Sequence, residues 1–143
     1  MAGFFIALLS GALMSVQGVF NTQVTKTTGA SVSNVWVQFS ALAVCFGIWL
    51  CAGRESLGAL ARVEPRYMLL GGAIGAGITW TVIRSMDQLG PAKAALLIVI
   101  AQLLVAYLIE LLGLFGVEQE PFAWRKAGGM ALALIGVAIF QWK

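Results

Sequence analysis

The sequence contains no histidine and very little charge. Of its 143 residues only 10% are charged, whereas 60% are apolar, and the mean hydropathy is +0.92. A soluble domain carries about a quarter charged residues, so this chain lacks the polar side chains that would cover a water-facing surface. The composition excludes a soluble globular domain and predicts an all-α integral membrane protein.

The missing residue types also exclude several kinds of site. Without histidine, the chain cannot build a His-based metal centre or a catalytic pair of His with Ser or Cys, and we expect no metal and no cofactor. The two cysteines, Cys45 and Cys51, are six residues apart on one expected helix, so they cannot bridge each other locally. The net charge of +3 is small and scattered, which predicts no binding to nucleic acid.

Charged residues divide the chain into five apolar runs, each near the ~20 residues that a membrane span needs. The first run has no basic residue before it and exceeds the ~7–15 residues of a signal core, so we expect it to be retained. The connections are short. We predict one membrane domain, residues 1–143, with helices at 3–23, 32–52, 67–86, 92–115 and 124–142.

Lysine and arginine are almost evenly divided between the two sides of this predicted bundle. Five lie on the amino-terminal side: Arg54, Arg62, Arg66, Arg125 and Lys126. Four lie on the other side: Lys26, Arg84, Lys93 and Lys143. Orientation normally follows an excess of these residues in cytoplasmic loops. Two interpretations stay open: a weak bias selects one orientation, or the protein has dual topology and pairs with an inverted copy or an inverted paralogue. An antiparallel homodimer would have ten helices and an inverted repeat, as many transporters do.

Small residues recur every three or four positions in the third and fifth predicted spans. Gly71 and Gly75 are four apart in the third, and Gly129, Ala133 and Gly136 follow one flank of the fifth. Such spacing lets two helices approach closely. We expect these glycines to tighten the bundle or its dimer face, and smooth faces would also let helices slide during a transport cycle.

Glu110 is an acid inside an apolar run, where a charged side chain costs ~2.5–3.5 kcal/mol on insertion scales. It lies roughly 10 Å from the middle of its predicted span, inside a hydrocarbon half-thickness of ~15 Å. Glu110 could bond a neighbouring helix or sit protonated near a thinned interface. Alternatively it faces a water-filled cavity and exchanges protons, because intramembrane acids usually mark ion or substrate pathways.

Other polar residues lie at depth on the same predicted spans. Trp80 is four residues from Arg84, which can reach the interface. In an inverted pair, Glu110 of one subunit would come level with Gln17 of the other, so both subunits would line each end of a cavity. Candidate substrate-binding residues are Gln17, Asn21, Trp80, Gln102 and Tyr107, of which Gln17 and Asn21 share one stripe and Tyr107 shares a face with Glu110.

Several segments resemble the five-helix YdcZ-like family of the drug/metabolite transporter superfamily. They are "SVQGVFNTQVTKTTGASVSNVWVQFSALAVCFG", "LLGGAIGAGI", "LGPAKAALLIVIAQ" and "RKAGGMALALIGV". The resemblance implies a multi-pass carrier of the bacterial cytoplasmic (inner) membrane that works as a dimer of five-helix units, often antiparallel. Where members often carry an Asp-His pair, this chain has Glu110 and Leu111, which removes any His-assisted proton step. The four-helix small multidrug exporters are also similar, but their acid is in the first helix, where this chain has none.

We therefore predict a secondary transporter of a small metabolite or drug-like molecule, using alternating access in a dimer and coupled to protons through Glu110. The alternative is a non-transporting membrane partner that assembles with another protein. An enzyme is not expected, because an intramembrane nucleophile would be a Ser or Thr without a nearby His or Lys.

Overall fold

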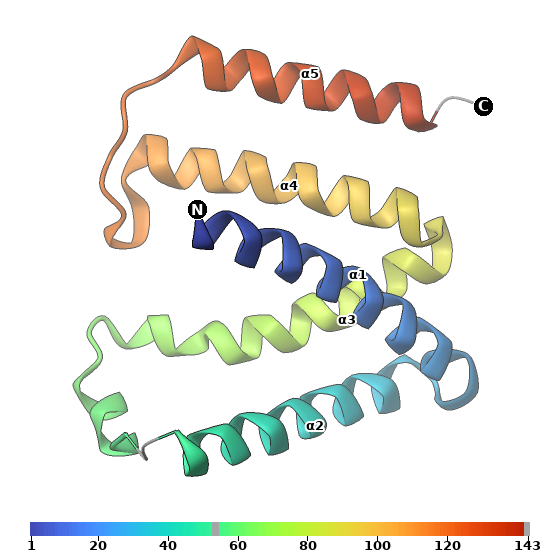
Figure 1. Cartoon of the computed structure of the whole chain (residues 1–143), viewed down its shortest axis with the longest axis vertical. Coiled ribbons are helices and arrows are strands. Elements are labelled where there is room, and N and C mark those ends of the chain that lie inside the picture. The colour runs from blue at the N-terminus through green and yellow to red at the C-terminus, as the bar shows by residue number, and fades with distance from the viewer. Residues whose placement is uncertain (53–54, 142–143) are drawn as a thin grey trace. The chain divides into compact units, whose positions relative to one another are not determined.

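Figure 1 shows the computed structural model of the chain, which describes residues 1–52 and 55–141. These residues form α-helices and short 3-10 helices, and no strand occurs among them. The α-helices are α1 (Ala2–Thr28), α2 (Ala30–Cys51), α3 (Gly71–Leu89), α4 (Pro91–Leu112) and α5 (Trp124–Gln141), and the 3-10 helices are η1 (Leu57–Arg62), η2 (Arg66–Leu70) and η3 (Leu114–Gly116). The predicted all-helical class is confirmed for this part of the chain.

The predicted helices differ from the observed ones mainly at their ends. α1 runs to Thr28 instead of 23, with Lys26 in its last turn, where a cation is favoured by the helix dipole. α3 begins at Gly71 because the four residues predicted before it belong to a 3-10 helix. α4 ends at Leu112 instead of 115, because Gly113 turns the backbone into the left-handed region (φ 62°). Arg54 and Lys143 of the charge comparison, and Trp142 of the last predicted span, lie outside the described residues.

Four helical segments of the described chain are long and apolar enough to cross a membrane. They are Ala2–Thr28, Ala30–Cys51, Arg66–Leu89 and Pro91–Leu112. The described part of α5 has 18 residues, which corresponds to about 27 Å of helix. Four spans have the required length and composition, and the fifth stays a prediction.

Contacts divide the chain into two compact units, Met1–Gln88 and Leu89–Lys143. In the first unit, the Met86 side chain of α3 reaches α1 at Gly18. A Cβ built on Gly18 would lie 2.5 Å from Sδ of Met86, whose side chain is buried. A side chain at position 18 would therefore have to displace the end of the Met86 side chain.

Polar side chains also connect the helices of the first unit. Ser33 is fully buried and its hydroxyl donates to the carbonyl oxygen of Asn21 (3.1 Å), which joins α2 to α1. Asn34 Nδ2 donates to the carbonyl oxygen of Ala76 (3.3 Å), and Gln38 Nε2 donates to Thr79 Oγ1 (3.2 Å). Hydrogen bonds of this kind hold helices together in lipid, where apolar burial against a neighbouring helix gives little advantage.

The glycines predicted to pack helices have open surroundings within their own units. A Cβ built on Gly71, Gly75, Gly129 or Gly136 would meet no atom of the same unit within 4 Å. These positions therefore leave smooth surface on α3 and α5, and their role in packing stays a prediction.

Gly18→Leu is expected to destabilise the first unit, because overpacking a filled contact typically costs ~1–3 kcal/mol. The matched control is Gly11→Leu on the same helix, where a Cβ meets nothing within 4 Å. In detergent, Gly18→Leu should melt several degrees below Gly11→Leu, and Met86→Ala should restore part of the loss. Equal melting temperatures for the two leucine variants would show that Gly18 is not a close contact.

Candidate functional site

In the second unit, the segment between α4 and α5 folds back against the end of α4. Gly113 begins it with a left-handed turn, and the Glu120 N–H then donates to the carbonyl oxygen of Glu110 (3.0 Å). The side-chain amide of Gln119 donates to the carbonyl oxygen of Leu111 (3.0 Å). The last carbonyls of a helix have no partner within it, and this segment supplies partners for two of them. The fold-back also brings the Glu120 side chain beside the last turn of α4.

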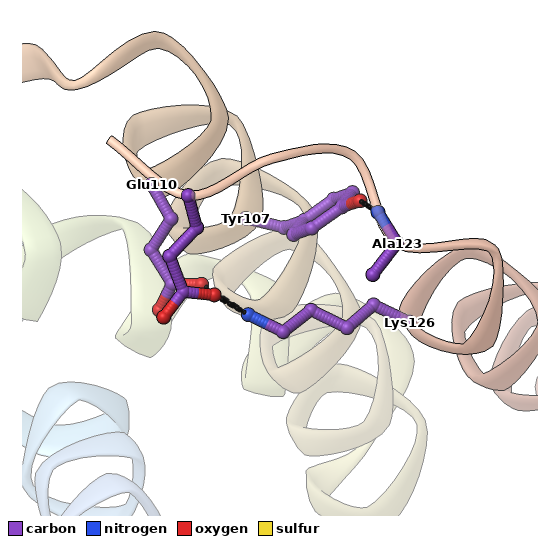
Figure 2. Close-up of polar contacts among 5 residues, drawn as sticks. Tyr107, Glu110, Ala123 and Lys126 are labelled. Carbon is purple, nitrogen blue, oxygen red and sulfur yellow. Dashed lines mark hydrogen bonds and ion pairs between the residues drawn. The ribbon is translucent and has the colours of Figure 1, made fainter. Parts of the chain in front are cut away.

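A lysine at the start of α5 bonds two carboxylates. Lys126 Nζ lies 2.9 Å from Glu110 Oε2 and also donates to the carboxylate of Glu120. Figure 2 shows the Lys126 side chain extending from α5 toward these carboxylates. All three side chains are accessible: Lys126 is 43% exposed, Glu110 41% and Glu120 54%. Two carboxylates facing one ammonium leave one negative charge in the cluster.

Tyr107 lies beside this cluster, one turn before Glu110 on α4. Its hydroxyl oxygen accepts the backbone N–H of Ala123 (3.1 Å), and only 9% of the residue is exposed. The centre of its ring is 5.7 Å from Lys126 Nζ, within the ~6 Å of a cation–π contact. Tyr107 therefore fixes the start of α5 and offers a ring face to the lysine.

An open hollow of about 350 Å³ lies between α4 and α5 and contains this cluster. The α4 residues lining it recur at helical spacing, so they share one face. The lining residues are Leu103, Ala106, Tyr107, Glu110, Lys126, Gly129 and Met130. The hollow thus combines a charged end with an apolar wall. Its Glu110 carboxylate is a group that can exchange a proton, and the hollow itself can hold a small amphipathic molecule. In residues 1–52 and 55–141, no three His, Cys, Asp or Glu side chains are grouped as a metal site requires.

The observed helix changes the depth assigned to Glu110. Measured from the middle of Pro91–Leu112, Glu110 is about 13 Å along the axis, not the 10 Å predicted from a helix ending at 115. It is also not a lone acid, because Lys126 bonds its carboxylate and also bonds the carboxylate of Glu120. The site therefore lies near the end of α4, close to the boundary of a ~15 Å half-core.

The other predicted site residues are distributed over both units. Gln17 and Asn21 line one open hollow on α1, of about 550 Å³, together with Met14; this agrees with the predicted stripe. The Arg84 guanidinium is 5.9 Å from the Trp80 ring on α3. Gln102 is exposed near the middle of α4 and is not among the residues that line the hollow with Tyr107 and Glu110.

Sequence reasoning missed Lys126 and Glu120 as partners of Glu110 and assigned Lys126 only to a loop charge count. The sequence contained one signal that could have identified Lys126. A short connection makes two successive helices antiparallel neighbours, so residues near the end of α4 and the start of α5 come level. The position of Glu120 depends on the folded-back segment, which has no periodic pattern.

These features define a polytopic α-helical membrane protein with a charged, partly apolar site on two of its helices. The chain belongs to the family described as "Putative inner membrane exporter, YdcZ", which it matches over residues 2–139. The predicted family is confirmed, and it is a family of membrane exporters, which is not an enzyme class. A search of curated proteins and a search of solved structures each found no match.

Tyr107→Phe should loosen the segment before α5, because the Ala123 N–H would lose its acceptor while Phe keeps the ring in place. Hydrogen exchange at the Ala123 amide should become faster, by about tenfold for a bond of ~1.4 kcal/mol. The Glu120 amide is the internal control, since its acceptor is a backbone carbonyl. Unchanged exchange at Ala123 would mean that the tyrosine hydroxyl does not hold this segment.

Proposed function

We propose that this chain is a proton-coupled exporter of small amphipathic molecules that works as an antiparallel dimer. The family description, "Putative inner membrane exporter, YdcZ", supports outward transport and an inner-membrane location. The observation that carries the proposal is the Glu110–Lys126 pair at the charged end of an apolar hollow. A proton-coupled carrier needs a group that takes and releases a proton between its states, and an accessible carboxylate paired with an ammonium meets that need.

Proton and substrate movement are coupled because both compete for the Glu110 carboxylate. The charged groups around it are Lys126 from α5 and Glu120 from the connecting segment, with the Tyr107 ring on its own helix. When Glu110 takes a proton it loses its attraction for Lys126, and when it releases the proton it binds a cation again. If proton and substrate cannot occupy this acid together, protons entering the cell drive the substrate outward by alternating access.

The dimer is proposed from the open glycine faces and the near-balance of basic residues. A Cβ added to Gly71 or Gly75 of α3, or to Gly136 of α5, would meet no atom of its own unit, and faces of small residues pair helices in membranes. In an inverted pair, Asn21 matches Glu110 in depth better than Gln17 does. Asn21 lies about 9 Å past the middle of Ala2–Thr28, and Gln17 only about 3 Å.

The coupling role is tested in proteoliposomes loaded with a pH-sensitive dye and exposed to cationic, neutral and anionic small molecules. At least one compound should move protons through the wild type, and Glu110→Gln should reduce that movement at least about tenfold, because an amide cannot exchange a proton. The control is Glu118→Gln, the same chemical change on an exposed acid of the connecting segment, which should transport normally. Full proton movement in Glu110→Gln would exclude this acid as the coupling group.

The antiparallel dimer is tested by co-expressing two differently tagged chains in which Cys45 and Cys51, both free and exposed, are replaced by Ala. One chain carries Asn21→Cys and the other Glu110→Cys. We expect disulfide-linked dimers from this mixture and none when both chains carry Asn21→Cys, since those positions face opposite sides in an inverted pair. The reverse result would indicate parallel subunits, and co-purification of a different chain would favour an assembly partner.

A further inference from the structure

Lys126 is surrounded in the way that a bound amine would be. Its ammonium donates to the carboxylates of Glu110 and Glu120 and lies over the ring of Tyr107. An alkylammonium has three N–H donors and no acceptor, and it is bound in proteins by carboxylates and by aromatic faces. The groups that would recognise a primary amine therefore meet at one point, and in this structure the Lys126 ammonium occupies that point.

The hollow next to this point suits the apolar body of such a ligand. Leu103, Ala106 and Met130 form its wall, and Gly129 leaves space one turn after Lys126. Its volume of about 350 Å³ is in the range of pockets that take small molecules, ~300–1,000 Å³. A ligand bound here would place a charged head among the carboxylates and a short hydrophobic body against α4 and α5.

The charge of the cluster favours a cation over an anion. One ammonium compensates only one of the two carboxylates, and Arg125, the next basic residue, does not line the hollow. An incoming anion would meet the uncompensated carboxylate, whereas an incoming cation would neutralise it.

Both carboxylates that hold Lys126 are accessible. Glu110 is 41% and Glu120 54% exposed, so an incoming ammonium can reach them. The lysine stem is flexible, so its ammonium can leave the carboxylates without any movement of α5.

We propose that the Glu110–Glu120–Tyr107 cluster binds a primary amine with a hydrophobic body, and that Lys126 occupies the amine position until a ligand displaces it. This inference rests on the proposed exporter function and names the substrate class of the same site. Lys126 is then an internal competitor, which keeps the two acids paired when no substrate is present.

The test measures binding of radiolabelled 2-phenylethylamine to the full chain in lipid nanodiscs by equilibrium dialysis, with empty nanodiscs subtracted. Phenylacetate, which has the same ring and an anionic head, is the comparison ligand. Lys126→Met should lower the Kd for phenylethylamine about threefold, because the competing ammonium is gone. Arg125→Met removes the same charge one residue away and should leave the Kd unchanged. Glu110→Gln should raise the Kd about threefold or more, and phenylacetate should show no saturable binding.

Three results would overturn the proposal: tighter binding of phenylacetate than of phenylethylamine, the same Kd in Lys126→Met and Arg125→Met, or no saturable amine binding in either the wild type or Lys126→Met. A circular dichroism melt of each variant shows whether it is folded, and Lys126→Gln replaces Lys126→Met if the latter is not.

Failure of this inference is distinguishable from failure of the exporter proposal. If a neutral or anionic compound moves protons through the wild type while phenylethylamine does not bind, the chain is an exporter with another substrate class. If phenylethylamine binds as described and no compound moves protons, the amine site is present and the exporter proposal is wrong.

Discussion

The pair formed by Glu110 and Lys126 is the interaction on which the site depends. A carboxylate among membrane helices is tolerated when a counter-charge and polar neighbours compensate its desolvation. Here the counter-charge comes from the first turn of α5, and the neighbours come from the segment that folds back after Gly113. The left-handed turn at Gly113, the Tyr107–Ala123 hydrogen bond and the Glu120 backbone bond all act to keep Lys126 within reach of this one acid.

The fold was largely predictable because hydrocarbon leaves few choices. A backbone in lipid must satisfy its own hydrogen bonds, so apolar runs of about 20 residues become helices. Charges that interrupt those runs mark the connections, and each α-helix of the described residues overlaps one predicted range. The ends were less predictable. The 3-10 turn at Arg66–Leu70 and the left-handed Gly113 are local backbone conformations, and neither leaves a mark in hydropathy.

The candidate site was predictable to the extent that it follows helical periodicity. Spacing placed Tyr107 with Glu110 and Gln17 with Asn21, and the observed hollows contain both pairs. Asn34 and Gln38 on α2 are also four residues apart, and both donate hydrogen bonds to α3. The spacing argument used for Gln17 and Asn21 would therefore have predicted that these two side chains share a face. Lys126 and Glu120 required knowledge of how an irregular segment folds. Gln102 was chosen for its depth alone, and depth does not determine which face a side chain occupies.

The central claim is that Glu110 faces Lys126 and the hollow between α4 and α5, instead of lipid chains. Solid-state NMR of the full chain in bilayers tests this directly, with ¹⁵N in lysine Nζ, ¹³C in glutamate Cδ and deuterated lipid tails. A dipolar coupling between Lys126 Nζ and Glu110 Cδ that disappears in Lys126→Met is the predicted result. The absence of this coupling in the wild type, together with close contacts between the Glu110 carboxyl and the lipid tails, would contradict it.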